Sequence, residues 1–372
     1  MDDEQIRTIA QERLVPLEGR APGRVNRDMV RGLADAGLLP ALFPQRLGGT
    51  ADADVSATTL CRLREHLAVV STEAETTLAL QGLGSYPIVQ SAPAALAQRW
   101  IPAVASGDAV AAFALTEPDA GTDAAALALQ AEPDGDGWRL TGEKVWISNA
   151  PDADVYTVFA RTTADAGARG VTAFVVPGDS EGLTGEAIEM LAPHAIGRLT
   201  FDGVRVERDA VLGDVDAGFR VAMRTLDLFR PSVGAFAVGM AQAALDAALE
   251  HAATRQAFGR PIVEFQAVGH QLAEMATRTK AARLLVYAAA EAYDAGRTEE
   301  ITEAAAMAKL YATETAQVVV DAAVQIHGAR ALAAGHLLEH LYREVRAPRI
   351  YEGTSEIQRT IIARQLLRRR DA

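Results

Sequence analysis

The apolar pattern of this 372-residue chain changes period twice, and no other feature of the sequence constrains the fold as strongly. Up to about residue 106 the apolar residues recur at helical spacing, with short breaks such as LFPQRLGGTADAD. From about residue 110, short apolar runs separated by turn signals replace that spacing, and it returns after residue 218. The order helices, strands, helices predicts a mostly α protein with a central β domain.

The domain boundaries follow from the same pattern: a helical domain at 1–108, a β domain at 109–214 and a second helical domain at 215–372. Five runs read as strands, AVAAFAL, WRLTGEKVWI, DVYTVFA, GVTAFVV and RLTFDGVRV. EPDGDGW is a hairpin-type turn, and RTTADAGARG is a polar loop between two strands. Long helices are predicted at 219–253, 264–295, 299–326 and 354–369.

Composition narrows the classes of function. Alanine dominates the apolar share, which favours helix because alanine loses no side-chain entropy there. The net charge of −13 argues against nucleic acid as a partner, so a phosphate-bearing ligand must meet local positive charge. The single cysteine, Cys61, forms no intramolecular disulfide and fits a reducing compartment. The acidic start MDDEQIRTIA is unlike a signal peptide, and no apolar run has membrane-spanning length, so we expect a soluble cytoplasmic protein without a membrane partner.

The common nucleotide and metal signatures are absent or weak. The chain has neither a G-x-G-x-x-G turn nor a P-loop, which argues against a Rossmann or P-loop enzyme. The segment HLLEH, from His336 to His340, matches an inverted zinc-protease motif. A polar helix face explains the same letters, and since no further ligand cluster accompanies them, we expect no metal.

Four segments carry the chemistry: FALTEPDAGTDAAAL, LTGEKVWISNA, ATRQAFGRPIVEFQAV with the later QIHG, and RIYEGTSEIQRTIIAR. Together they resemble the acyl-CoA dehydrogenase family from the N-terminal domain to the C-terminus. The resemblance implies a three-domain fold with an N-terminal α bundle, a β-barrel-like middle domain and a C-terminal four-helix bundle. It also implies FAD as cofactor and α,β-dehydrogenation of an acyl thioester.

The first two segments imply the flavin site. In FALTEPDAGTDAAAL the family meets the flavin ring and the thioester, at the positions of Leu115, Thr116 and Thr122. In LTGEKVWISNA it covers the other face of the ring, at the positions of Trp146, Ile147 and Ser148. A hairpin with a capping threonine and a core tryptophan are the alternatives, but the match over LTEPDAGTD favours cofactor contact.

The third segment implies an oligomer, most simply a homotetramer. Its positions Arg255, Phe258 and Gln266, with Gln325, Ile326 and Gly328 of QIHG, match contacts to the FAD of a neighbouring subunit. A guanidinium suits the pyrophosphate because its fork of donors pairs with phosphate oxygens. The chain departs from the family at Ala329, where a second glycine is usual.

The fourth segment implies the catalytic base. The glutamate of Y-E-G-T is the base in the family and here is Glu352, flanked by Tyr351 and Gly353 at substrate-contacting positions. An apolar slot closed by substrate would raise the affinity of that carboxylate for a proton. Thr354 should cap the next helix, and Thr354 and Glu356 match flavin contacts, although glutamine is usual at 356.

The acyl pocket is implied by weaker matches. Some relatives take their base from the residue before an Arg-Pro step, but Phe229 stands there and accepts no proton, which leaves Glu352 as the base. Arg230 then matches a cation that supports Glu352 or the thioester arm. Leu83 and Tyr86 of LQGLGSYPI match the far end of the acyl tunnel, facing Phe229, and predict a shallow slot for short or branched acyl groups. Core packing of a helix pair is the alternative for Leu83 and Tyr86.

The sequence leaves the thioester carrier and the alternative functions open. EMLAPHAIGRLTF replaces the family's usual stretch near the carrier arm, so the thioester carrier is CoA or an acyl carrier protein. An electron-transferring flavoprotein or a similar carrier is expected to accept the electrons, and fatty acid metabolism is the expected context. A flavin oxidase or monooxygenase on the same fold is the alternative enzyme, and a catalytically silent thioester-binding protein is the alternative outside catalysis.

Overall fold

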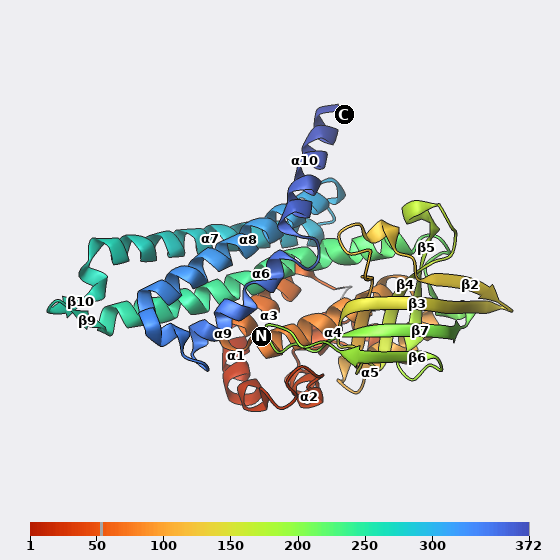
Figure 1. Cartoon of the computed structure of the whole chain (residues 1–372), viewed down its shortest axis with the longest axis horizontal. Helices are drawn as coiled ribbons and strands as arrows, with labels where there is room; N and C mark the ends of the chain where they lie inside the picture. Colours follow the sequence, from red (N-terminus) through yellow and green to blue (C-terminus); the bar gives the residue numbers. More distant parts are fainter. Residues whose placement is uncertain (53–54, 372) are drawn as a thin grey trace. The chain divides into compact units, whose positions relative to one another are not determined.

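The computed structural model describes residues 1–52 and 55–371, which fall into two compact units (Figure 1). The first unit comprises residues 1–11, 56–75 and 227–372, and the second comprises 12–55 and 76–226. Helices α4 (Thr72–Ser91) and α6 (Gly218–Thr254) contribute residues to both units.

The first unit is helical. Besides its part of α6, it contains α1 (Asp3–Ile9), α3 (Ala57–Val70), α7 (Gln266–Asp294), α8 (Thr298–His327), α9 (Leu337–Glu344) and α10 (Ser355–Asp371). The short hairpin β9 (Gln256–Ala257) and β10 (Arg260–Pro261) joins α6 to α7. The four long helices predicted after residue 218 are confirmed, with ends that differ by one or two residues, whereas α9 and the hairpin were not predicted.

Helix α6 packs at the centre of this unit because small residues let other helices come close. A Cβ on Gly239 would lie 2.4 Å from the backbone oxygen of Glu65 in α3, so only glycine fits there. Among the described helices, α6 alone is long and apolar enough to cross a membrane by length and composition, but 78% of its most apolar window is buried inside the protein. The core helix of a globular domain has the same character, so this finding is weak evidence for a span. Cys61 of α3 is also buried, as expected for a helix-packing residue.

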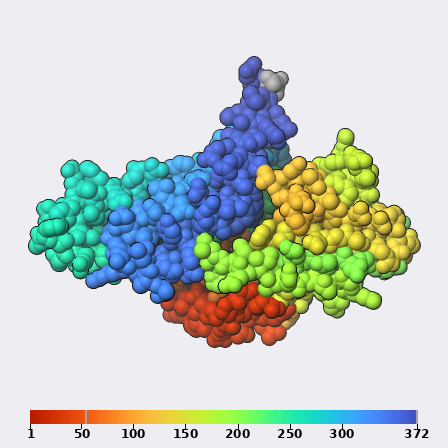
Figure 2. All heavy atoms as spheres, in the orientation of Figure 1, coloured from red at the N-terminus to blue at the C-terminus, as the bar shows by residue number. Residues whose placement is uncertain are grey.

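Helix α10 is the C-terminal helix of the first unit. Its last turns project beyond the other helices of the unit (Figures 1 and 2), and Leu366 and Leu367 are exposed there. Its first turn, by contrast, is anchored: Ser355 is buried and donates a hydrogen bond to Glu314 of α8 at 2.6 Å. The anchored end is the one that follows Glu352.

The second unit is built on a mixed sheet. Its strands are β1 (Ala111–Ala114), β2 (Gln130–Asp134), β3 (Gly137–Ser148), β4 (Val155–Arg161), β5 (Val171–Pro177), β6 (Leu183–Ala187), β7 (Ile196–Val206) and β8 (Val211–Leu212). The order is β6-β7-β3-β2-β4-β5-β8, with β1 paired in parallel to β4. The five predicted strand runs are confirmed, and EPDGDGW is a hairpin turn as predicted, but it joins β3 to β2 rather than to a predicted run; β2, β6 and β8 were not predicted.

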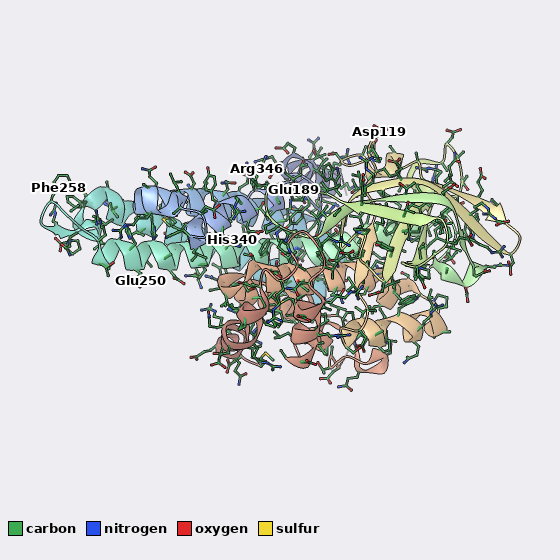
Figure 3. The ribbon with its side chains drawn as sticks, turned by 60° about the horizontal axis from the view of Figure 1, so that its bottom comes forward. Asp119, Glu189, Glu250, Phe258, His340 and Arg346 are labelled. Carbon is green, nitrogen blue, oxygen red and sulfur yellow. The ribbon has the colours of Figure 1, made fainter. Side chains whose placement is uncertain are left out.

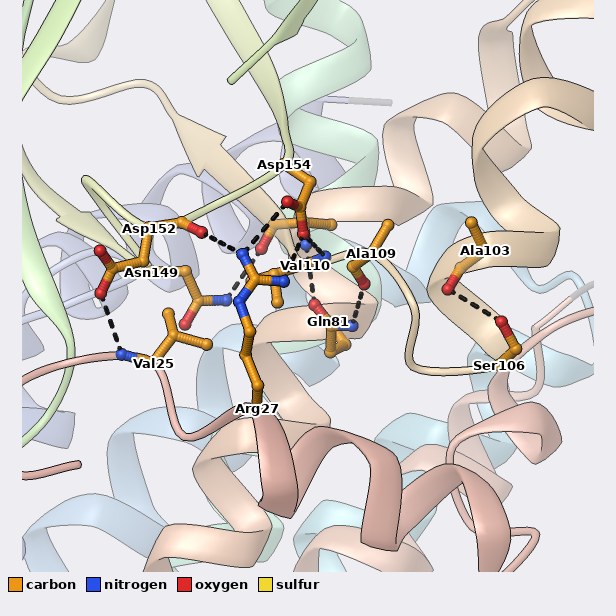
Figure 4. A network of polar contacts seen from close by, with 11 residues as sticks. Val25, Arg27, Gln81, Ala103, Ser106, Ala109, Val110, Asn149, Asp152 and Asp154 are labelled. Atoms are coloured by element: carbon orange, nitrogen blue, oxygen red, sulfur yellow. Dashed lines mark hydrogen bonds and ion pairs between the residues drawn. The ribbon is translucent and has the colours of Figure 1, made fainter. Parts of the chain in front are cut away.

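Helices α2 (Arg27–Asp35) and α5 (Ala94–Ala105) belong to the same unit, and a polar network ties α2, α4 and the start of β1 together (Figure 4). The Gln81 amide accepts from Ala111 N at 2.8 Å and donates to Ala109 O at 2.9 Å, in the manner of a neighbouring strand. Asp154 accepts from Val110 N and from Arg27. The network fixes where β1 begins, and hence where the LTEPDAGTD segment leaves it.

Candidate active site

Glu352 lies in a turn between a 3₁₀ segment (Ala347–Arg349) and α10. The φ angles of Glu352 and Gly353 are 54° and 92°, a left-handed conformation that a glutamate seldom adopts. The Glu352 carbonyl oxygen accepts from Arg230 Nε at 3.2 Å. The Gly353 carbonyl oxygen accepts from Lys309 Nζ at 2.7 Å. The structure therefore brings Arg230 to the Glu352 turn, and adds Lys309 of α8, which the sequence did not single out.

One carboxyl oxygen of Glu352, Oε2, accepts no hydrogen bond from the described residues. The residue is only partly buried, but its Oε2 is enclosed and has no hydrogen-bond partner among the described residues. Burial raises the pKa of the Glu352 carboxyl. Three nearby cations, Arg64, Lys309 and Arg230, offset part of that rise. A carboxylate with a raised pKa and an unoccupied oxygen is suited to accept a proton.

A buried ion pair stands in the same unit within electrostatic reach of Glu352. Arg64 of α3 donates to Glu75 of α4 and, through Nη1, to Ser232 of α6 at 2.7 Å; all three side chains are buried. The charge of Arg64 also acts on Tyr351, which precedes Glu352 in the chain. This pair could not be predicted from the sequence, because a lone arginine and a lone glutamate on different helices form no motif.

A second buried pair holds the LTEPDAGTD segment in the second unit. Lys144 of β3 donates to Glu117 Oε1 at 2.7 Å and to Leu115 O at 2.9 Å. Glu117 also accepts from the backbone N–H groups of Ala128 and Leu129. Burial lowers the pKa of Lys144 from 10.5 to about 8, against the opposing charge of Glu117. Neither residue was singled out, although Glu117 is the glutamate of the TEPD motif.

The residues predicted to meet a flavin lie around this pair. Leu115 is buried, Thr116 O accepts from Val145 N at 3.0 Å, and Thr122 is exposed. Trp146 has a φ of 60° at an irregularity in the β3–β7 register, and its side chain is 55% exposed although its neighbour Ile147 is buried. An exposed indole beside partly buried hydroxyls offers a stacking face and hydrogen-bonding groups, so these residues fit a flavin ring.

The structure brings together the two segments predicted to serve a neighbouring subunit. His251, near the end of α6, stacks on His327, the last residue of α8, with ring centroids 4.2 Å apart. This contact places the Arg255 segment beside the QIHG segment. All six predicted residues lie in these segments at partly or fully exposed positions: Arg255, Phe258, Gln266, Gln325, Ile326 and Gly328. Phe258 is 95% exposed at the tip of the β9–β10 hairpin (Figure 3).

The remaining predicted residues are placed as follows. Thr354 accepts from Ile357 N at 3.4 Å and caps α10, as predicted, while Glu356 is exposed. Tyr351 is 37% exposed, and Phe229 is buried in the core of the first unit. Leu83 and Tyr86 are half-buried on one face of α4, which leaves their predicted place at the tunnel floor untested.

The two histidines of HLLEH have separate structural tasks. His336 precedes α9 and accepts from Leu338 N at 3.1 Å, as a helix cap. His340 (Figure 3) bonds the hydroxyl of Thr72 at 2.7 Å. Within residues 1–52 and 55–371, no group of three or more His, Cys, Asp or Glu side chains is arranged to hold a metal ion.

Comparison with known proteins agrees with this geometry. The chain matches the acyl-CoA dehydrogenase N-terminal domain at residues 2–108, the middle domain at 112–204 and the C-terminal domain at 216–367. This chain belongs to the acyl-CoA dehydrogenase family. It has the three-domain fold of that family, with a central mixed sheet, and it is an FAD-dependent enzyme that dehydrogenates acyl-CoA. The matches do not favour the oxidase, monooxygenase or silent alternatives.

Members of the family with known names match over nearly the whole chain. Cyclohexane-1-carbonyl-CoA dehydrogenase of Geobacter metallireducens is 34% identical over 98% of this chain and 96% of its own length. The mitochondrial short-chain specific acyl-CoA dehydrogenase of Bos taurus is 37% identical over 97% of this chain and 88% of its own. The structure of butyryl-CoA dehydrogenase from Megasphaera elsdenii superposes with a TM-score of 0.93 at 31% identity, covering 98% of this chain and 97% of that one.

Proposed function

We propose that Glu352 is the base that removes the α proton of the acyl-CoA substrate. The observation that carries this proposal is the enclosed Oε2 of Glu352, which has no partner among the described residues, in a carboxyl group whose pKa burial raises. A raised pKa brings a carboxylate closer to the working pH, where it accepts a proton most effectively.

The reaction then proceeds by two bond cleavages in the substrate. Glu352 takes the proton from the α carbon, the electron pair left behind forms the α,β double bond, and a hydride leaves the β carbon. Bound FAD supplies the acceptor for that hydride. The positive charges of Arg64, Arg230 and Lys309 limit the rise in the pKa of Glu352, and so favour the ionised form that can accept the proton.

An anaerobic titration tests the assignment of the base. Butyryl-CoA should bleach the flavin absorbance of the parent enzyme, whereas Glu352→Gln should keep its FAD and lose at least about a hundredfold in bleaching rate, because an amide has the shape of the base without its basicity. A Glu352→Gln variant that bleaches at the parental rate would show that another group is the base. The matched control is Glu207→Gln, which changes an exposed acid paired with Arg205 in the second unit, outside every segment proposed for the site.

The flavin is proposed to bind at the Leu115, Thr116 and Thr122 segment and at Trp146, Ile147 and Ser148. Support comes from the exposed indole of Trp146 and from the buried Glu117–Lys144 pair, which fixes both segments. Thr354 and Glu356 are the further residues proposed to contact it. Because the carboxylate of Glu356 would repel phosphates, its backbone is the better candidate for contact.

A homotetramer is the proposed assembly. Arg255, Phe258, Gln266 and the QIHG residues form one exposed cluster, as required of groups that reach the FAD of a neighbouring subunit. The long helices of the first unit also carry large apolar side chains exposed on the single chain. They include Leu284, Leu285, Tyr311 and Val318. Exposed apolar residues gathered on one unit indicate a covered surface.

The acyl group is proposed to be short or branched, with Leu83 and Tyr86 at the floor of its slot and with Phe229, Tyr351 and Gly353 lining it. Support comes from the relatives named for short-chain and butyryl substrates, and from the bulk of Leu83 and Tyr86. Acyl-CoA is the substrate class of the family, and an acyl carrier protein thioester is the second substrate to compare in the titration.

An electron-transferring flavoprotein is the proposed electron acceptor, a partner to which the family is linked. A cytoplasmic location and a role in fatty acid metabolism complete the proposal. The location is supported by the single buried thiol of Cys61, which suits a reducing compartment.

A further inference from the structure

The turn that carries Glu352 is held through its backbone rather than through its carboxylate. Glu352 and Gly353 both have positive φ, and a glutamate in this conformation needs support from the surrounding structure. Oε2 of Glu352 receives no hydrogen bond from the described residues. The direction of the carboxylate must therefore be set by the groups that hold the peptide units on its C-terminal side.

Three buried side chains from three helices hold those peptide units. Arg230 Nε and Gln358 Nε2 each donate to the carbonyl oxygen of Glu352 at 3.2 Å. Lys309 Nζ and Gln358 Nε2 donate to the carbonyl oxygen of Gly353 at 2.7 and 2.9 Å. Two successive carbonyls are thus each held twice, and Gln358 bridges them. We call Arg230, Lys309 and Gln358 the carbonyl clamp.

The clamp also explains why glycine follows the base. A Cβ at position 353 would lie 2.7 Å from Gln358 Nε2, and would push the bridging amide off both carbonyls. The φ of 92° at Gly353 disfavours any other residue as well. Glycine at position 353 is therefore what allows Gln358 to bridge the two carbonyls.

We propose that Lys309 and Gln358 are positioning residues for the reaction: with Arg230 they hold the left-handed turn so that the Glu352 carboxylate faces the α carbon of the substrate. This inference rests on the proposed role of Glu352 as base. Lys309 acts in two ways, through its hydrogen bond and through its charge, whereas Gln358 acts through hydrogen bonds alone. The difference between them provides the test.

The charged groups around the turn define what each substitution changes. They are Arg230 and Asp227 of α6, Arg64 of α3, Glu75 of α4, Lys309 and Glu314 of α8, Glu344 of α9, Glu356 of α10 and the phenol of Tyr351. The pKa of Lys309 is lowered to about 8, mainly by burial, so its ammonium is mostly charged at pH 7. That charge favours the ionised form of Glu352, and its loss raises the pKa of the base further.

The experiment compares Lys309→Met, Lys309→Arg and Gln358→Leu with Thr313→Val. Thr313 lies one turn along α8, is equally buried, and bonds the carbonyls of Lys309 and Leu310 within its own helix. The kcat and KM for butyryl-CoA are measured across pH on protein with full FAD content. The protonation of Glu352 without substrate is followed by infrared titration. The spectrum of the Glu352→Gln counterpart is subtracted from that of each variant, so that the difference reports the Glu352 carboxyl.

Lys309→Met should lower kcat at least about tenfold with little change in KM, because a base displaced by about an ångström loses much of its rate. The acid limb of its pH profile and the infrared titration should both move to higher pH. Gln358→Leu should also lower kcat, but leave the acid limb in place. Lys309→Arg should keep the parental limb, and Thr313→Val should resemble the parent throughout.

The proposal is overturned by a parental kcat in folded Gln358→Leu, or by a parental titration of Glu352 in Lys309→Met. Should Lys309→Met fail to fold, a displaced acid limb in Lys309→Arg or a parental kcat in Gln358→Leu would overturn it. An active Glu352→Gln enzyme would instead refute the base itself, and the infrared titration would still report whether Lys309 sets the protonation of Glu352.

Discussion

Replacing Glu117 by glutamine should destabilise, in a pH-dependent manner, the segment of the second unit that we propose faces the flavin. In the parent, Glu117 accepts from Lys144 and from the N–H groups of Ala128 and Leu129. The amide of a glutamine offers one acceptor oxygen and one donor nitrogen in place of two acceptor oxygens. One donor therefore loses its partner, and Lys144 loses its counter-charge in a fully buried position.

The magnitude follows from the two losses. The pKa of Lys144 is about 8, so releasing its proton at pH 7 costs about 1.4 kcal/mol. Because Lys144 can release its proton when the counter-charge is missing, the loss of that counter-charge costs no more than about this value. A buried backbone N–H left facing another donor costs about 1–3 kcal/mol. We expect a loss of about 3 kcal/mol in the free energy of unfolding at pH 7.

The pH dependence has a definite sign. Without Glu117 the pKa of Lys144 falls below about 8, so the folded variant binds fewer protons than the unfolded chain, and its stability rises with pH toward the unfolded value of 10.5. The stability of the parent rises with pH over a narrower range, from about pH 8 upward. The gap between parent and variant should shrink by about 1.4 kcal/mol from pH 7 to pH 9.

Urea unfolding followed by tryptophan fluorescence at pH 7 and pH 9 measures both quantities. The control is Asp134→Asn, which breaks an exposed pair with Arg139 in the same sheet and should cost less than about 1 kcal/mol. The double variant Glu117→Gln, Lys144→Met should recover part of the loss, because no buried charge remains. A Glu117→Gln variant as stable as the control, or a gap that is the same at both pH values, would refute the reasoning.

Three further predictions concern the base, the cofactor and the pocket. Burial raises the pKa of Glu352 above the ordinary 4.5, so its stabilising contribution is complete below pH 4.5 and is lost as pH rises through the folded-state pKa. In calorimetry, Glu352→Gln should therefore melt at a higher temperature than the parent at pH 8, but not at pH 4. Arg255→Ala should purify with less FAD per chain, and a monomer with full FAD by light scattering and absorbance would contradict the proposed contact. Leu83→Ala should shift the kcat/KM profile toward longer acyl-CoAs, each methylene accommodated adding about 0.8 kcal/mol, and an unchanged profile would remove Leu83 from the tunnel floor.

The chemistry-bearing motifs could be read from the sequence because each is a local run of letters. Residues 351–356 contain the proposed base, the glycine that follows it and the helix cap. The turn and the Thr354 cap are where they were expected. The long helices were equally predictable, since 3.6-residue periodicity is a local property. Gln358 lies in the same motif, but its letter does not show that it bridges two carbonyls.

The partners of these motifs were decided by tertiary structure. Lys309 stands alone in the alanine-rich helix α8, 44 residues before its contact at Gly353, and Arg64 and Glu75 meet from two different helices. The stack of His251 on His327 joins two segments that the sequence gives no reason to pair. Short strands such as β6 and β8 escaped prediction because few residues define them and the strands beside them supply their pairing.

The sequence by itself therefore determined the order of helices and strands and the family motifs, and it singled out Glu352 as the proposed base, because these depend on neighbours along the chain. The tertiary structure alone decided which distant cations surround Glu352, which carbonyls they hold and which carboxylate fixes Lys144. These contacts depend on burial, which makes a charge costly unless a partner from elsewhere in the fold meets it. No local pattern records where that partner lies.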